Sequence, residues 1–192
     1  MGDNNMTEIK RLKREELVFV AIDYQERLLP AMSGRDRIEK GVIRLAAGLN
    51  VFNIPKIVTT QYAKGLGPTV SRVAEAFGEF EPIDKSAFSA FKTEEFREKL
   101  EKTGKPGKKT VILAGIETHI CVEQTALDLL ESGYDVVLAA DCCGCRDDEN
   151  HRIALRRLAG AGVTVTSGES ILYEILKSAK APEFKAISAI VK

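Results

Sequence analysis

The sequence predicts an α/β protein with three layers, in which helices cover both faces of a mostly parallel β-sheet. Short continuous apolar runs, typical of strands buried on both faces, alternate along the chain with stretches that repeat apolar residues at helical spacing. Parallel strands need such helical crossover connections. With 192 residues the chain can bury a substantial core, and we expect one domain over 1–192 that begins with a polar extension at 1–16.

The strands follow from apolar runs that are bounded by turn residues. The clearest run is 110–114, which comes after a turn signal at 103–107 that contains two glycines and a proline. Pro82 weakens the pattern in 81–84, because proline has no N–H to donate to a neighbouring strand. The expected strands are 17–22, 54–60, 81–84, 110–114, 135–140 and 163–166.

The helices follow from apolar residues at intervals of three and four. In 36–51 these residues share one face. Thr93 is expected to cap the start of the helix at 93–102, and Gly133 to cap the end of the helix at 120–132. The expected helices are 36–51, 69–77, 93–102, 120–132, 149–159, 171–179 and, at the C-terminus, 182–192.

The composition argues against several classes of protein. Lys and Arg together number 28, as do Asp and Glu, so the chain lacks the basic excess of a nucleic-acid binder. No apolar run approaches the ~20 residues that cross a membrane. The four cysteines occur in a chain whose first residues lack the apolar stretch of a secretory signal. We therefore expect reduced thiols in a cytoplasmic protein with no nucleic-acid or membrane partner.

Three chemically active side chains come at or just after the ends of predicted strands. Asp23 follows the first strand, Lys85 follows the third, and Cys121 comes just past the fourth, at the start of a helix. A doubly wound sheet brings such positions to one crevice, where ligands bind. There Cys121 can act as a nucleophile, with Asp23 as proton acceptor. The helix N-terminus and the Lys85 cation are expected to lower the thiol pKa below its free value of about 8.5.

Each of these residues also has a purely structural explanation. A cysteine at a strand–helix junction is more often a small buried hydrophobic residue than a nucleophile. Asp23 alone suits a turn, and Lys85 alone suits a solvated surface position. Taken singly, the residues leave both explanations open.

Three short motifs resemble those of the isochorismatase-like cysteine hydrolases. The segment 115–122, Gly-Ile-Glu-Thr-His-Ile-Cys-Val, resembles the nucleophile motif of that superfamily. The segment 22–25, Ile-Asp-Tyr-Gln, resembles its Asp-x-Gln motif, and 84–88, Asp-Lys-Ser-Ala-Phe, resembles its lysine segment. The motifs occur in the family's order, and the similarity extends over about 18–170. Within the superfamily, 59–69 is most similar to the poorly characterised isochorismatase-domain proteins, which are related to nicotinamidases.

The resemblance implies a fold, a catalytic set and a reaction. The fold is a six-stranded parallel sheet in a Rossmann-like order. The catalytic set is Asp23, Lys85 and Cys121, and a cis peptide between Ile116 and Glu117 accompanies an oxyanion hole made by the N–H groups of Glu117 and Cys121. The reaction is hydrolysis of a small amide-like C–N bond through a covalent thioester, with no cofactor. The resemblance also implies a small-molecule substrate and a homo-oligomer.

Gln25, in the Asp-x-Gln motif, and Gln61 are expected to contact the substrate. Nicotinamidases usually carry Asp and His metal ligands near the position of Gln61, where this chain has no His close by. We therefore expect no bound metal there. The remaining candidate ligands lack the paired Cys-x-x-Cys spacing of a zinc site, and they are Cys142, Cys143, Cys145 and His151.

Two other functions are left open. The first is a non-catalytic binding or scaffold protein that keeps this fold. Such a protein would be expected to have lost the nucleophile, and the presence of Cys121 therefore argues against it. A nuclease-like activity is the second alternative, against which the balanced charge argues. His119, inside the nucleophile motif, suits a structural position or the rim of the site as well as a catalytic one.

Overall fold

The computed structural model describes residues 11–104, 107 and 109–192. Its strands form one sheet, and they are β1 (Leu17–Ile22), β2 (Lys56–Gln61), β3 (Ile83–Lys85), β4 (Thr110–Gly115), β5 (Asp135–Ala139) and β6 (Thr164–Thr166). The α-helices of this part of the chain are α1 (Arg35–Val51), α2 (Ala63–Leu66), α3 (Ser71–Phe77), α4 (Glu94–Lys102), α5 (Glu123–Glu131), α6 (Asp148–Gly160), α7 (Gly168–Leu176) and α8 (Phe184–Val191).

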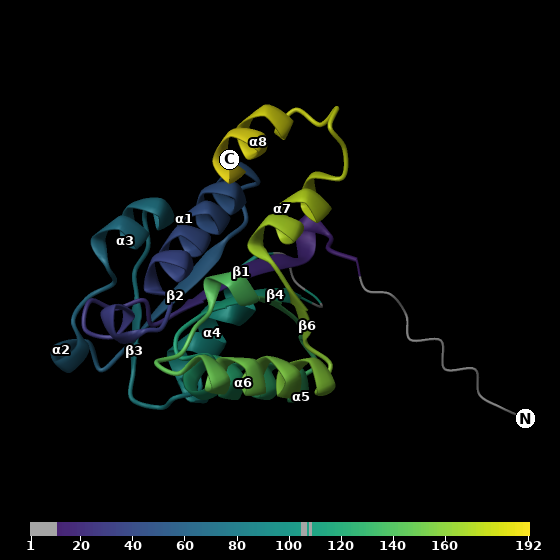
Figure 1. Ribbon diagram of the computed structural model, residues 1–192. Coiled ribbons are helices and arrows are strands. Elements are labelled where there is room, and N and C mark those ends of the chain that lie inside the picture. The colour runs from purple at the N-terminus through teal and green to yellow at the C-terminus, as the bar shows by residue number, and fades with distance from the viewer. Residues whose placement is uncertain (1–10, 105–106, 108) are drawn as a thin grey trace, which may run out of the picture.

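All neighbouring strands run parallel, in the order β3-β2-β1-β4-β5-β6. Helices α1, α3, α7 and α8 cover one face of the sheet, and α4, α5 and α6 cover the other (Figure 1). The predicted three-layer α/β fold with a six-stranded Rossmann-like sheet is therefore confirmed. The chain builds outward from β1 on one side and from β4 on the other, so these two strands flank the topological switch point.

The centre of the sheet is fixed by close packing of β1 against β4. Both strands are buried along their whole length, and Ile22 pairs with Gly115 at their carboxyl ends. A Cβ on Gly115 would lie 2.5 Å from the Ile22 carbonyl oxygen, and the residue has a φ of 156°. Glycine is needed here because the two backbones approach so closely. The register makes Asp23 and Ile116 leave the sheet next to each other.

The third strand starts later than predicted. Its predicted range was 81–84, but β3 begins after Pro82, which lacks the N–H that a ladder needs. Lys85 is consequently the last residue of the strand instead of the first residue beyond it. Side chains alternate between the two faces of a strand, and Ile83 and Lys85 are buried whereas Asp84 is exposed. The shift therefore turns Lys85 inward.

The second strand also starts later than predicted, at Lys56 instead of residue 54. Asn53 has a φ of 54°, so the chain is still turning out of α1 at that point. The strand extends one residue further than predicted, to Gln61. The sequence analysis did not predict the short helix α2 that follows.

The predicted helices are all present, with shifted ends. The helix predicted at 120–132 starts with a π-helical turn, Thr118–Val122, and continues as α5. Gly133 ends it as predicted, with a φ of 85°. Thr93 precedes α4, but its side chain makes no capping hydrogen bond, so that part of the prediction is wrong. The seventh helix begins three residues before the predicted 171, because the Ser167 hydroxyl accepts a hydrogen bond from the Ser170 N–H.

Parts of two predicted segments lie outside the described residues. These are 1–10 of the polar extension and 105, 106 and 108 in and after the predicted turn. The end of the extension packs on the domain: Leu12 is buried, and its N–H donates to the Glu174 carboxylate at 3.1 Å. Among the described helices, none is both long and apolar enough to cross a membrane.

Phe77, at the end of α3, is a centre of the core on one face of the sheet. It is fully buried. Its ring makes edge-to-face contacts with Phe19, Tyr24 and Phe80, at centroid distances of 6.0, 6.4 and 5.6 Å. Such aromatic pairs contribute about 0.5–1.5 kcal/mol each beyond the area that they bury.

We predict that Phe77→Ala lowers the free energy of unfolding by about 3–5 kcal/mol, because it leaves a cavity among three aromatic rings. Urea unfolding followed by circular dichroism measures this. Ile153→Ala is the matched control, because Ile153 on α6 is 48% exposed and its truncation should cost about 0.5 kcal/mol or less. Similar losses in the two variants would contradict the assignment of Phe77 to the core.

Candidate active site

Asp23, directly after β1, is fully buried at the switch point of the sheet. Its backbone has a φ of 55°, which turns the chain sharply away from the strand. One carboxylate oxygen, Oδ1, accepts a hydrogen bond from the Thr59 hydroxyl at 2.7 Å. The other, Oδ2, accepts one from the Lys85 ammonium at 2.8 Å. The carboxylate is thus held between neighbouring strands with both of its oxygens occupied.

Lys85 brings a positive charge into the same buried place, and its side chain has no exposed area. Besides Asp23, its Nζ donates to the Gln61 Oε1 at 2.7 Å and to the carbonyl oxygens of Phe88 and Ala87 at 3.1 and 3.3 Å. A buried charge persists only where it is paired and hydrogen-bonded. This set of oxygens meets that requirement and fixes the ammonium in position.

Gln25 and Gln61 form the frame around the Asp23–Lys85 pair. The buried Gln25 amide donates to the carbonyl oxygens of Gln61 and Gly67 at 3.1 and 2.7 Å, and it accepts from the Gln61 N–H at 2.7 Å. The Gln61 side chain accepts from Lys85 and donates to the Ser86 carbonyl oxygen at 2.9 Å. Both amides are therefore engaged within the protein.

The third residue, Cys121, lies in the π-helical turn that follows β4. The peptide bond between Ile116 and Glu117, which leads into this turn, is cis. The Cys121 carbonyl oxygen accepts a hydrogen bond from the Thr125 hydroxyl at 2.6 Å, which ties the turn to α5. The thiol faces Asp23 and Lys85, and it interacts with both of them. The structure therefore brings together the three residues that the sequence analysis singled out.

The pKa of the Cys121 thiol is raised to about 12, mainly by burial. The Asp23 carboxylate raises it further through its charge and a hydrogen bond, and the Lys85 ammonium lowers it. The expectation that Lys85 and the helix start would lower the pKa below that of a free cysteine is wrong for this resting state. Burial and the Asp23 carboxylate together outweigh the cation, so the thiol holds its proton at neutral pH.

Beside this set lie two further pairs of side chains. The Glu117 carboxylate accepts hydrogen bonds from the Arg146 Nε at 3.0 Å and from the Arg146 backbone N–H at 2.9 Å. The His119 Nδ1 lies 3.1 Å from the Cys145 Sγ. The sequence analysis did not predict either pair. The loop after β5 follows the turn after β4, as the bridge between Ile116 and Gly144 shows, and this path brings the residues together.

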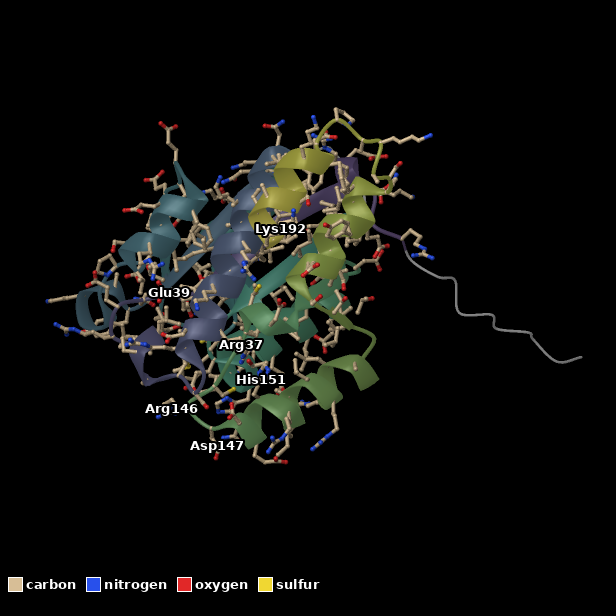
Figure 2. The ribbon with its side chains drawn as sticks, turned by 45° about the horizontal axis from the view of Figure 1, so that its top comes forward. Arg37, Glu39, Arg146, Asp147, His151 and Lys192 are labelled. Atoms are coloured by element: carbon tan, nitrogen blue, oxygen red, sulfur yellow. The ribbon has the colours of Figure 1, made fainter. Side chains whose placement is uncertain are left out.

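His151 does not join the cysteines that precede it in sequence. Its Nδ1 lies 2.9 Å from the Thr118 hydroxyl, and burial and the Arg37 charge lower its pKa. Figure 2 shows Arg37 beside His151, with Arg146 and Asp147, the residue that precedes α6, further toward the edge of the molecule. Cys142 and Cys143 are fully buried, and all four cysteines are free thiols.

The sheet is parallel and doubly wound, and a thiol, a carboxylate and an ammonium lie at its switch point. These features are those of proteins with the isochorismatase fold. Residues 18–170 match the model of the isochorismatase domain family. The chain belongs to this family.

Relatives and solved structures agree with this assignment. The chain is 36% identical over 188 residues to isochorismatase domain-containing protein 1 of Danio rerio, and the match covers 98% of this chain and 65% of that protein. The structure of MAR1 ribonuclease from Caenorhabditis elegans is 31% identical with a TM-score of 0.87, covering 95% of this chain and 92% of that one. YcaC from Escherichia coli, an octameric hydrolase of unknown specificity, is 25% identical with a TM-score of 0.89, covering 96% and 91%. Membership of this family supports the assignment of the chain to the hydrolases.

The raised pKa of Cys121 predicts an unusual pH dependence of its alkylation. The thiolate is the reactive form, so the rate of reaction with iodoacetamide should rise about tenfold per pH unit from about pH 7 to 10. A free cysteine levels off near its pKa of about 8.5. Mass spectrometry of the Cys121 peptide after timed labelling at each pH measures the rate.

Two variants of the neighbouring charges should change this rate in opposite directions. Asp23→Asn removes the charge that raises the pKa, so labelling at pH 8 should be faster than in the wild type. Lys85→Met removes the charge that lowers the pKa, so labelling should be slower. Circular dichroism checks that both variants fold. A rate that levels off below pH 9, or that changes in the same direction in both variants, would contradict this description of the site.

Proposed function

We propose that this protein is a cysteine hydrolase that cleaves a small amide-like C–N bond through a covalent thioester on Cys121. The observation that carries the proposal is the buried Asp23–Lys85 ion pair in contact with the Cys121 thiol at the switch point of the sheet. A buried ion pair adds little to stability compared with apolar packing of the same volume. Its position against a thiol in the ligand-binding crevice supports a chemical role.

The first half of the reaction starts from a protonated thiol. As the Cys121 sulfur attacks the carbonyl carbon, its proton passes to the Asp23 carboxylate, which already interacts with the thiol. The carbonyl oxygen becomes an oxyanion, to which the N–H groups of Glu117 and Cys121 donate hydrogen bonds. Asp23 then gives the proton to the leaving nitrogen. The C–N bond breaks, the amine leaves, and the acyl group remains on Cys121 as a thioester.

The second half of the reaction uses the same groups with water. Asp23 takes a proton from a water molecule, whose oxygen attacks the thioester carbonyl carbon. The C–S bond breaks, the acid product leaves, and the proton returns through Asp23 to the Cys121 sulfur. The sum is amide plus water giving acid plus amine. No cofactor takes part, and the enzyme returns to its starting state.

Lys85 has an electrostatic role in this scheme. Its ammonium keeps Asp23 ionised and therefore ready to accept a proton, and it stabilises the thiolate as the proton leaves. Gln61 holds the ammonium through its Oε1, and Gln25 holds the backbone of Gln61. We therefore assign both glutamines to positioning Lys85, in place of the substrate contacts expected from the sequence. A metal ion does not fit at Gln61, because the Gln61 Oε1 already accepts from the Lys85 ammonium.

The proposal predicts which changes abolish turnover. A screen of small amides should yield a substrate that the wild type hydrolyses and Cys121→Ala does not. With that substrate, Asp23→Asn should slow turnover by about 10²- to 10⁴-fold, the usual contribution of general acid–base catalysis. The same variant should be alkylated faster than the wild type, so loss of activity with a more reactive thiol separates the proton-transfer role from thiol activation.

Intact mass spectrometry provides the control for this experiment. An acyl adduct on Cys121 should accumulate in rapidly quenched wild-type enzyme and be absent from Cys121→Ala. Wild-type turnover by a folded Asp23→Asn variant would show that Asp23 is not the proton shuttle. Hydrolysis that survives Cys121→Ala would overturn the covalent mechanism.

Ribonuclease activity is a second candidate, because the MAR1 relative from Caenorhabditis elegans is a ribonuclease by name and shares 31% of its sequence. The balanced charge of this chain opposes it. We expect no RNA cleavage and only weak RNA binding. Incubation of labelled single-stranded RNA with wild type and Cys121→Ala tests this. Cleavage by purified wild type, together with binding that weakens steeply as salt rises, would favour the ribonuclease.

We also propose that the protein is a homo-oligomer acting on a small molecule. The octameric state of YcaC from Escherichia coli supports the first part. Tyr62 and Phe88, which follow β2 and β3, have large side chains that are 58% and 53% exposed, as residues of a subunit contact or of a substrate rim would be. Light scattering of the purified protein measures the number of subunits.

A further inference from the structure

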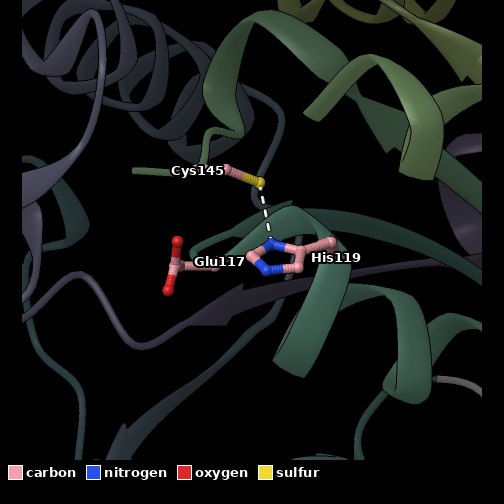
Figure 3. Close-up of side chains that lie close together, drawn as sticks. All are labelled: Glu117, His119 and Cys145. Atoms are coloured by element: carbon pink, nitrogen blue, oxygen red, sulfur yellow. Dashed lines mark hydrogen bonds between the residues drawn. The ribbon is translucent and has the colours of Figure 1, made fainter. Parts of the chain in front are cut away.

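Glu117, His119 and Cys145 form a cluster outside the Asp23–Lys85–Cys121 set. They come from two segments, the turn after β4 and the loop after β5. One ligand atom from each residue lies within 4.8 Å of the others. Figure 3 shows the three side chains close together, with the His119 Nδ1 directed at the Cys145 sulfur. Cys145 is fully buried, Glu117 is nearly so, and His119 is half-buried.

This combination of ligand atoms has a definite chemical preference. Thiolate sulfur, imidazole nitrogen and carboxylate oxygen are together the ligands of Zn²⁺ and of chemically similar divalent transition metals. In a tetrahedral zinc site, with Zn–S of about 2.3 Å and Zn–N of about 2.0 Å, ligand atoms lie about 3.5 Å apart. The His119–Cys145 distance of 3.1 Å is close to this value. All three ligand atoms lie within 4.8 Å of one another, so the carboxylate has to approach the other two to complete the set.

We propose that Glu117, His119 and Cys145 form a binding site for a divalent transition metal of the Zn²⁺ type, with the fourth position open to water. Binding replaces the thiol proton: the Cys145 S–H bond breaks, the proton leaves to solvent, and the sulfur binds the metal as a thiolate. The two anionic ligands balance the charge of the ion.

The surroundings of the cluster favour this chemistry. Burial raises the pKa of the Cys145 thiol, and hydrogen bonds from the His119 and Thr118 backbone and from the Thr118 hydroxyl oppose that rise. These hydrogen bonds favour the thiolate, as the outer hydrogen bonds of metal sites do, and a bound cation has to supply the rest. The Arg146 backbone N–H holds the Glu117 Oε2 at 2.9 Å. The Arg146 guanidinium, which is paired with Oε1, is on a side chain that is 65% exposed, so it can move into solvent when a metal takes its place.

The expected consequence is a link between two segments that already lie side by side. The Thr118 N–H donates to the Gly144 carbonyl oxygen at 2.9 Å, so the segments touch without a metal. A metal held by Glu117, His119 and Cys145 would join the turn that carries Cys121 to the loop after β5. The site is separate from the proposed hydrolysis, whose steps use none of its three side chains.

Cobalt(II) is the direct probe, because a thiolate bound to it gives an intense charge-transfer absorption and a tetrahedral site gives visible d–d bands. Titration of the full chain should show both at about one equivalent of Co²⁺, and added Zn²⁺ should remove them. Cys145→Ser should abolish the charge-transfer band. His119→Asn and Glu117→Gln should weaken Zn²⁺ binding by more than the about 10- to 100-fold that loss of an outer partner costs.

His151→Asn and Cys121→Ser are the matched controls. His151 is the other histidine of the chain, and it lies against Thr118 without belonging to the cluster. Both control variants should keep the cobalt spectrum and the Zn²⁺ affinity. Absence of a charge-transfer band in the wild type, its persistence in Cys145→Ser, or its loss in Cys121→Ser would overturn the proposal. None of these measurements uses amide turnover, so failure here is distinct from failure of the proposed function.

Discussion

The buried ion pair between Asp23 and Lys85 is the constraint on which the site depends. Removing two charges from water costs several kcal/mol each, and only close geometry with further hydrogen bonds recovers it. Those bonds come from Thr59 and Gln61 at the end of β2, and from carbonyl oxygens after β3. The carboxyl ends of three neighbouring strands are thus held by one pair of charges. Cys121 follows β4, which lies on the other side of β1 from β2 and β3. Its thiol therefore faces a carboxylate whose position is fixed by these hydrogen bonds.

The sequence predicted the central part of this arrangement because its strands are long and continuous. Runs such as 17–22 and 110–114 are buried on both faces, and this leaves little freedom in where Asp23 and Cys121 emerge. The edge was predicted less well. Three residues make too short a strand for a clear pattern, so the start of β3 was predicted two residues early and its end one residue early. A lysine in such a strand suits a solvated position until the whole sheet is known, and Lys85 is instead completely enclosed.

Contacts between loops were beyond prediction for a different physical reason. Nearness in sequence suggested grouping Cys145 with Cys142, Cys143 and His151. Strand pairing decides otherwise, because the loop after β5 follows the turn after β4 and sets Cys145 against His119. The direction of the Cys121 pKa shift also needed the structure. It is a balance of burial, an anion and a cation, and sequence gives the residues but not their depth or distances.

A protonated resting thiol has a consequence for selectivity. Thiolates are the forms that electrophiles and oxidants attack, and burial together with Asp23 keeps Cys121 out of that form. On the proposed mechanism the nucleophile appears only while a carbonyl group lies against it and can take the developing negative charge to the oxyanion hole. On this mechanism the Asp23 carboxylate that accepts the proton also helps burial to keep the sulfur unreactive between turnovers. Substrate position, and not the intrinsic reactivity of the thiol, then decides when the C–N bond is attacked.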